Sequence, residues 1–245
     1  MAKIPYAKMP RAVRPSHALL ALLGTAAVQY LAITADFEGY VPLGYLDPVG
    51  IPTKCFGDTT NVQVGKKYSF EECEKSLNTH SVEIIKPIRK CIKNFNALPD
   101  KSKAAIASMA YNIGPSAMCS SSIIKYANAG NLTRMCSRMR EIYLYATDRK
   151  TGKKVVLDGL KIRRNKEADL CEQGLKESKE VGNAKDKTID EILLESAADS
   201  PRISPRADKP VEPDKIEVVH QAPSDSGFFS RLWFSIRSRV QSVFN

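Results

Sequence analysis

Several residue patterns that carry common functions are missing from this chain. Its three histidines, His17, His80 and His220, have no metal-ligand spacing, and no C-x-x-C pair occurs. These absences argue against a zinc site, because zinc ligands come in closely spaced pairs. No helix-turn-helix, RNP-like or zinc-finger pattern is present either, which excludes the common nucleic-acid-binding modules. We therefore expect no metal, no cofactor and no nucleic-acid partner.

Cysteine is missing from the last part of the chain. The six cysteines are Cys55, Cys73, Cys91, Cys119, Cys136 and Cys171. An even number confined to one region favours disulfides formed in an oxidising compartment. Buried free thiols in a cytosolic protein are the alternative. The sequence alone does not choose among the many possible pairings.

Acidic residues are scarce in the first 175 residues, where basic residues outnumber them, whereas the chain from Lys176 onward is nearly neutral. The net charge of +10 therefore belongs to the first part of the chain. Because opposite charges attract over long distances, this distribution suits an anionic polymer or surface as the partner.

No charged residue occurs between Pro15 and Ala35, although residues 1–14 are basic and contain no acid. As a helix, residues 18–35 would span about 27 Å, enough for a thin bilayer core. Basic residues before this segment and acidic residues after it predict an amino terminus in the cytoplasm and a domain outside.

Three interpretations of residues 18–35 remain open. Alanine, glycine and threonine dilute its leucines, which favours a signal-anchor-release segment that exports and tethers the protein and later leaves the membrane. A cleaved signal peptide is the second, although cleavage after Ala35 would put Ile33 at the −3 position, where small residues are preferred. An ordinary buried helix of a cytosolic protein is the third. A permanent anchor would contain more leucine and isoleucine.

Two carboxylates and a hydroxyl follow the apolar segment. Glu38 comes where this helical segment ends, and Asp47 precedes Pro48 and Gly50 in a stretch that predicts a small hairpin reaching Thr53. A helix end that faces a hairpin can hold two carboxylates across a cleft. Cleavage of a glycosidic bond uses this arrangement, with one protonated acid and one ionised carboxylate. Glu38, Asp47 and Thr53 are therefore the candidate catalytic residues.

The spacing of these three residues resembles that of the phage-type lysozymes of glycoside hydrolase family 24. Four further blocks resemble motifs of this family in the same order. They are Tyr45 to Gly50 (YLDPVG), Tyr111 to Gly114 (YNIG), Ser121 to Gly130 (SSIIKYANAG) and Gly159 to Glu167 (GLKIRRNKE). The resemblance covers residues 36–175. One departure is Asp58, where the family commonly has His.

The resemblance implies an α+β, mostly helical fold, with a lysozyme-like two-lobed domain made of a small β-hairpin lobe and a helical lobe, followed by a C-terminal extension. It implies a muramidase that hydrolyses the β-1,4 bond between N-acetylmuramic acid and N-acetylglucosamine, with inversion. Glu38 is then the general acid, with a pKa raised by partial burial, while Asp47 and Thr53 orient the attacking water. Asn112 and Gly114 would line the substrate cleft or cap a helix. Similar exported phage lysozymes imply the disulfides Cys55–Cys73, Cys91–Cys119 and Cys136–Cys171.

Local signals predict the elements of this domain. Residues 40–65 should form turns and short strands. Ser69 to Glu72 is a capping box that opens a long helix, which Pro87 should break or kink. The helices expected after it are 99–114, 116–129, 131–146 and 160–173.

Composition divides the chain into six segments. They are a basic N-terminal region (1–17), the apolar segment (18–35), the lysozyme-like domain (36–175), a charged helical segment (176–198), a Pro-rich linker (199–225) and a basic amphipathic helix (226–245). The last segment has no acid and carries apolar residues at helical spacing. Such a helix can lie in anionic lipid or the outer membrane. Docking on the protein itself or pairing with another copy is the alternative.

The predicted function is an endolysin that is exported to the host periplasm, is initially tethered to the inner membrane by residues 18–35, and lyses the host cell by cutting peptidoglycan. Two other functions remain open. One is a catalytically silent cell-wall-binding or membrane-disrupting protein that acts through its cationic domain and terminal helix. The other is a related glycosidase that acts on chitin or chitosan.

Overall fold

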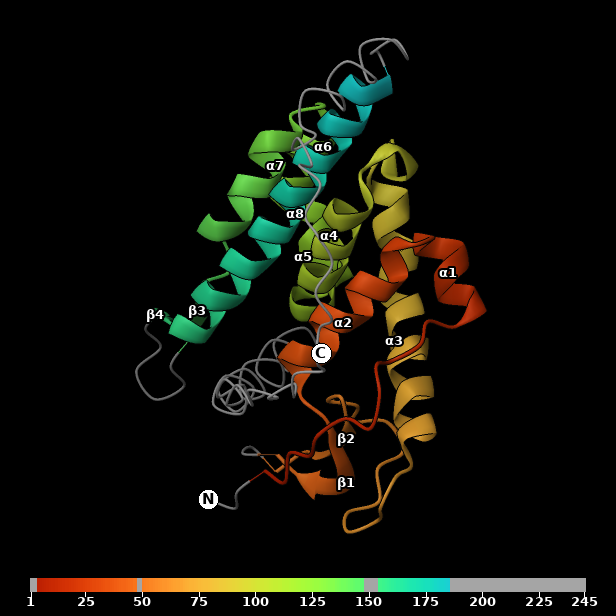
Figure 1. Ribbon diagram of the computed structural model, residues 1–245. Helices are drawn as coiled ribbons and strands as arrows, with labels where there is room; N and C mark the ends of the chain where they lie inside the picture. The colour runs from red at the N-terminus through yellow and green to blue at the C-terminus, as the bar shows by residue number, and fades with distance from the viewer. Residues whose placement is uncertain (1–3, 48–49, 148–153, 186–245) are drawn as a thin grey trace, which may run out of the picture. The chain divides into compact units, whose positions relative to one another are not determined.

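The structure, a computed structural model shown in Figure 1, describes residues 4–47, 50–147 and 154–185. Its contacts divide the chain into two units, residues 1–176 with 225–245 and residues 177–224. The described part of the second unit is helical. The described part of the first unit is α+β and mostly helical, as the sequence predicts. The expected linker and terminal amphipathic helix lie outside the described residues, and the six-segment division stays a prediction.

The apolar segment forms two helices rather than one. Helix α1 (His17–Leu23) and helix α2 (Ala26–Glu38) are bent by 108° relative to each other. The Ser16 side chain caps α1 by accepting a hydrogen bond from the Leu19 amide, and Gly24 ends it with a φ of 59°. Within the described residues, no single helix has the length and apolarity needed to cross a membrane, and α1 and α2 meet that test only as a bent pair.

Both helices belong to the main hydrophobic core of the first unit. Leu19, Leu23, Tyr30 and Leu31 are buried in it. Helix α2 packs along α4 (Asp100–Ile113), which is rich in buried alanine. Small side chains let neighbouring helices approach closely and fill space at high density. The core therefore includes much of the apolar segment at residues 18–35, whose three interpretations the sequence leaves open.

A short hairpin follows α2 directly. Strand β1 (Val41–Leu46) pairs antiparallel with β2 (Pro52–Cys55), and Tyr45 lies opposite Thr53. The register is irregular between Val41 and Tyr45. This hairpin confirms the strands expected within residues 40–65.

Helix α3 (Phe70–Cys91) begins at the predicted capping box, in which the Ser69 and Glu72 side chains each accept a hydrogen bond from the other residue's amide. Pro87 lies inside the helix and does not break it. Buried isoleucines on both sides of Pro87 pack this stretch against the core, which offsets the hydrogen bond that proline cannot donate.

The rest of the helical lobe is more divided than the sequence predicts. The 3-10 turn η1 (Phe95–Ala97) precedes α4. The helix expected at 116–129 is split into α5 (Pro115–Ser120) and α6 (Ser122–Asn128), because Ser121 is extended, with a ψ of 158°. Such a backbone cannot continue an α-helix.

The region expected as one helix at 131–146 also differs. It forms α7 (Leu132–Arg138), the 3-10 turn η2 (Met139–Glu141) and the strand β3 (Tyr145–Thr147). Strand β3 pairs antiparallel with β4 (Lys154–Val156). Helix α8 (Asp158–Lys185) follows and continues well past the predicted end at residue 173.

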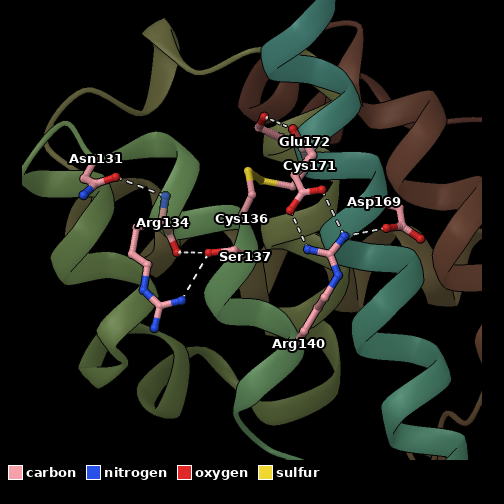
Figure 2. Close-up of a disulfide and its surroundings, with 9 residues drawn as sticks. Asn131, Arg134, Cys136, Ser137, Arg140, Asp169, Cys171 and Glu172 are labelled. Carbon is pink, nitrogen blue, oxygen red and sulfur yellow. Dashed lines mark hydrogen bonds and ion pairs between the residues drawn. A yellow bond between two sulfur atoms is a disulfide. The ribbon is translucent and has the colours of Figure 1, made fainter.

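Three disulfides connect these elements. Cys55–Cys73 joins the end of β2 to α3, Cys91–Cys119 joins the end of α3 to α5, and Cys136–Cys171 joins α7 to α8. These are the pairings that the family resemblance implies. Figure 2 shows Cys136–Cys171 beside Arg140, whose guanidinium pairs with Asp169 and Glu172 of α8.

Candidate active site

Glu38 is the last residue of α2, and its side chain is fully buried. Its Oε1 atom lies 3.3 Å from Nη1 of Arg163 on α8. Gly39 ends the helix with a φ of 71°, which turns the chain toward β1. A positive φ is easily adopted by glycine and costs other residues energy. The E-G pair therefore has a structural cause: the glycine lets a helix that ends in Glu38 lead straight into the hairpin.

Asp47 and Thr53 lie at the two sides of the hairpin turn, and both are buried. The Asp47 carboxylate accepts a hydrogen bond of 2.8 Å from the Ile51 amide, and its backbone carbonyl accepts one of 2.9 Å from the Gly50 amide. The Thr53 hydroxyl donates to the Ile51 carbonyl at 3.0 Å. Ile51 therefore connects the two candidate catalytic side chains.

Tyr45 of β1 is buried and lies opposite Thr53. Burial, followed by its neighbour Tyr6, raises the pKa of the Tyr45 hydroxyl. The charges of Asp47 and Glu38 act in the same direction.

A buried ion cluster, defined here as Arg163, Arg164 and Glu167 of α8, lies next to Glu38. Arg163 Nε lies 3.0 Å from Glu167 Oε1, and Arg164 Nη1 lies 2.5 Å from Glu167 Oε2. The Ser108 hydroxyl donates to Glu167 at 2.8 Å. Burial lowers the pKa of Arg164 to about 10, although Glu167 opposes this change. Two arginines thus share one glutamate, and Arg163 also faces Glu38.

The sequence analysed alone does not predict this cluster. On a helix, the spacing R-R-x-x-E places both arginines three or four residues from the glutamate, where side chains are neighbours. This spacing is the local signal that could have indicated the cluster. Nothing local indicates that Arg163 would reach Glu38, which lies 125 residues away in the chain.

The predicted substrate-binding residues have structural partners. Asn112 accepts a hydrogen bond from the Arg164 guanidinium. Gly114 separates α4 from α5 with a φ of 85°. Contact of either residue with substrate stays a prediction. Among residues 4–47, 50–147 and 154–185, no three histidine, cysteine or acidic side chains group as metal ligands.

The fold and the buried glutamate at a helix–hairpin junction are those of a lysozyme-like protein, and solved structures with the same architecture support this assignment. The endolysin from Escherichia coli O157:H7 phage FAHEc1 superposes with a TM-score of 0.54 and 33% identity, over 61% of this chain and 92% of that one. The active form of the P1 phage endolysin Lyz superposes with a TM-score of 0.53 and 25% identity, over 64% of this chain and 93% of that one.

The phage lysozyme family model matches residues 35–167, and the chain belongs to this family of muramidases. Among its relatives, the SAR-endolysin of Bacteriophage PS119 is 29% identical, over 60% of this chain and 87% of that protein. The SAR-endolysin of Pseudomonas phage phiKMV is 30% identical, over 61% of this chain and 90% of that protein. Membership of the family implies that the chain hydrolyses peptidoglycan.

Proposed function

We propose that this protein is an endolysin that cuts the β-1,4 bond between N-acetylmuramic acid and N-acetylglucosamine, with Glu38 as the general acid. The observation that carries the proposal is a fully buried glutamate at the end of α2, next to the hairpin that bears Asp47 and Thr53. This pairing of one secluded acid with a second carboxylate is what glycosidic cleavage requires.

The surroundings of Glu38 suit a proton donor. Removal from water favours the neutral form of a carboxyl group, whereas a nearby guanidinium favours the ionised form. Arg163 divides its charge between Glu38, at 3.3 Å, and Glu167, at 3.0 Å. Arg163 therefore favours the ionised form of Glu38 less strongly than a guanidinium with a single partner would. Glu38 would transfer this proton to the glycosidic oxygen as the bond breaks.

Asp47 and Thr53 would orient the attacking water. The ionised Asp47 is stabilised by the Ile51 amide and can face the positive charge that develops on the sugar ring. The Thr53 hydroxyl donates its hydrogen bond to the Ile51 carbonyl. Its oxygen can therefore accept a hydrogen bond from the water and orient it. The water would attack from the face opposite the leaving group and pass its proton to the Asp47 carboxylate, which would invert the anomeric carbon. These steps require no cofactor.

We further propose that the protein reaches the periplasm tethered to the inner membrane by residues 18–35. The support is the charge-free composition of this segment, the basic residues before it and the names of the SAR-endolysin relatives. A chain with α1 and α2 in lipid cannot also have Leu19, Tyr30 and Leu31 in the core of the enzyme. The tethered form would then lack a positioned Glu38 and would be inactive until the segment left the membrane.

The deciding experiment compares wild type with Glu38→Gln in a turbidity assay on chloroform-treated Gram-negative cells. The control is Asp36→Asn, which removes an exposed carboxylate two residues earlier on the same helix. We expect Glu38→Gln to lose lysis by about a hundredfold or more, because general acid catalysis contributes that much, and Asp36→Asn to retain it.

Unchanged killing of cells by Glu38→Gln would favour the catalytically silent alternative. Digestion of purified peptidoglycan tests the bond specificity, and new reducing ends on N-acetylmuramic acid are expected. Digestion of chitin or chitosan in place of peptidoglycan would favour the third function. Full activity of membrane-inserted protein, measured before the membrane potential is collapsed, would refute the inactive tethered form.

A further inference from the structure

The segment that precedes α1 is not a loose extension. We call residues 4–16 the N-terminal arm. Figure 1 shows the arm, at the red end of the colour scale, running from the β1–β2 hairpin past α3 to α1. It contacts two elements that lie far from it in the sequence, the hairpin and the first turns of α3.

The first contact is with the hairpin. The Ala7 amide donates to the Tyr40 carbonyl at 2.8 Å, so that the arm bridges the start of β1 in antiparallel fashion. Ile4 is buried against Val41 and Tyr45 in a small apolar cluster of its own. Ile4 is the only buried member of this cluster that does not come from the hairpin, among the residues that the structure describes.

The second contact is with α3, and it is ionic. Arg11 makes two hydrogen bonds to the Glu74 carboxylate, at 2.6 and 2.9 Å, and its guanidinium lies 4.6 Å from the centre of the Phe70 ring. The Arg14 amide donates to the same carboxylate at 2.6 Å. Asn78 accepts from the Ser16 amide at 2.7 Å and donates to the Arg14 carbonyl at 2.9 Å.

These contacts place the arm across both the hairpin and α3. A two-stranded hairpin alone is only marginally stable, so it needs packing from elsewhere. Tyr45, which Ile4 covers, lies opposite Thr53 in the ladder and two residues before Asp47. Movement of Tyr45 would therefore shift both candidate catalytic residues of the hairpin.

We propose that Ile4 and Arg11 are positioning residues, which hold the hairpin with Asp47 and Thr53 in its working geometry by clamping the arm between β1 and α3. The proposal rests on the proposed function of Asp47 and Thr53. The loop around Lys66 also supports β1, through hydrogen bonds to Gly44. The arm therefore refines the position of the hairpin rather than creating it, and its loss should slow the enzyme without unfolding it.

The proposed tether gives the arm a further consequence. In the tethered orientation the basic arm lies on the cytoplasmic side, whereas the hairpin and α3 lie outside. The arm can dock only after it has followed the apolar segment across the membrane. The Arg11–Glu74 pair would then form only after release.

The test uses the full-length soluble protein and soluble peptidoglycan fragments, with kcat and KM measured separately. Ile4→Ala and Arg11→Ala are expected to lower kcat by about threefold to tenfold, the range of a charge-assisted pair or a partly buried side chain, with KM nearly unchanged. Arg11→Lys should lose less than Arg11→Ala, because it keeps the charge but not the two-pronged geometry.

The matched control is Arg134→Ala. Arg134 also makes two hydrogen bonds to one carboxylate, that of Glu141, and lies over an aromatic ring, that of Tyr126, but on α7. The variant Arg134→Ala should leave kcat unchanged. Hydrogen exchange supplies a second readout: the amides of residues 41–55 should exchange faster in Ile4→Ala and Arg11→Ala and not in Arg134→Ala.

Equal kcat values for Ile4→Ala, Arg11→Ala and Arg134→Ala would overturn the proposal. So would unchanged exchange in the hairpin despite a lower kcat. A wild type without muramidase activity would instead overturn the proposed function, and hydrogen exchange would then still decide whether the arm holds the hairpin.

Discussion

Arg163 Nη1 lies 3.3 Å from Glu38 Oε1, and solvent reaches neither residue appreciably, with side-chain exposures of 2% and 0%. Arg163 also donates to the Ser108 carbonyl at 3.1 Å and faces Glu167. A single guanidinium thus joins the candidate acid on α2 to both α4 and α8. The proposed chemistry at Glu38 and the packing of α2, α4 and α8 therefore involve the same buried group.

Arg163→Ala should be strongly destabilising. It would leave the Glu167 carboxylate buried with Arg164 as its remaining arginine, and loss of one partner of a buried pair costs about 3–5 kcal/mol. Urea unfolding followed by circular dichroism measures the loss. Arg140→Ala is the control, because Arg140 pairs with carboxylates on α8 at the surface and should cost about 1 kcal/mol or less. Equal costs for the two variants would contradict the prediction.

The Cys136–Cys171 disulfide should keep the enzyme active to a higher temperature, because it ties α8 to α7. It closes a loop with a sequence separation of 35 residues, which predicts a loss of about 3–4 kcal/mol for the double alanine variant. Because α8 carries Arg163 and Glu167, we expect hydrolysis to fall at a lower temperature than in the wild type. Activity measured against temperature, beside a thermal unfolding curve, tests this. Identical curves for the variant and the wild type would refute it.

Asp58 should make stability depend on pH. Burial opposes its ionisation, but hydrogen bonds from Ser76 and Lys54 and from the Thr60 amide outweigh burial and hold the pKa of Asp58 below its ordinary value of 3.8. A carboxyl group with a lowered folded pKa contributes stability above its ordinary pKa, and the contribution is lost as pH falls through the folded value.

The variant Asp58→Asn should therefore be less stable than the wild type by about 1.5–3 kcal/mol at pH 6, the scale of a hydrogen bond to a charged group. The difference should shrink as the pH falls below the ordinary value of 3.8. Thermal unfolding at several pH values between these conditions and strong acid measures it. A difference that stays constant with pH would show that Asp58 acts through its shape rather than its charge.

Gly44 of β1 should not tolerate a side chain. A Cβ atom at this position would lie 2.0 Å from the Gln63 carbonyl oxygen, so Gly44→Ala must displace the backbone of the hairpin. Gly130→Ala is the comparison, because it meets open space but has a φ of 74°. We expect Gly130→Ala to cost about 1 kcal/mol, the usual penalty for a left-handed residue, and Gly44→Ala to cost more. Unfolding midpoints and kcat distinguish them, and an equal cost would argue that the hairpin moves freely.

Elements with local causes could be predicted from the sequence. The capping box at Ser69 and Glu72 and the hairpin turn near Gly50 are present in the structure, because caps and turns depend on residues a few positions apart. The division at Ser121 and the pairing of β3 with β4 were not predicted. Ser121 is compatible with a helix by its neighbours alone, and strand pairing is decided by which segments meet.

The amino-acid sequence by itself determined the order of the chemical groups: a charge-free segment followed closely by Glu38, a turn that carries Asp47 and Thr53, and cysteines confined to one region. Only the tertiary structure decided that this segment bends at Gly24 and enters the core, and that Arg163 faces Glu38. The reason is physical. A turn or a cap forms between neighbours in the chain, whereas the burial of a charge and the choice of its partner depend on which distant segments pack together.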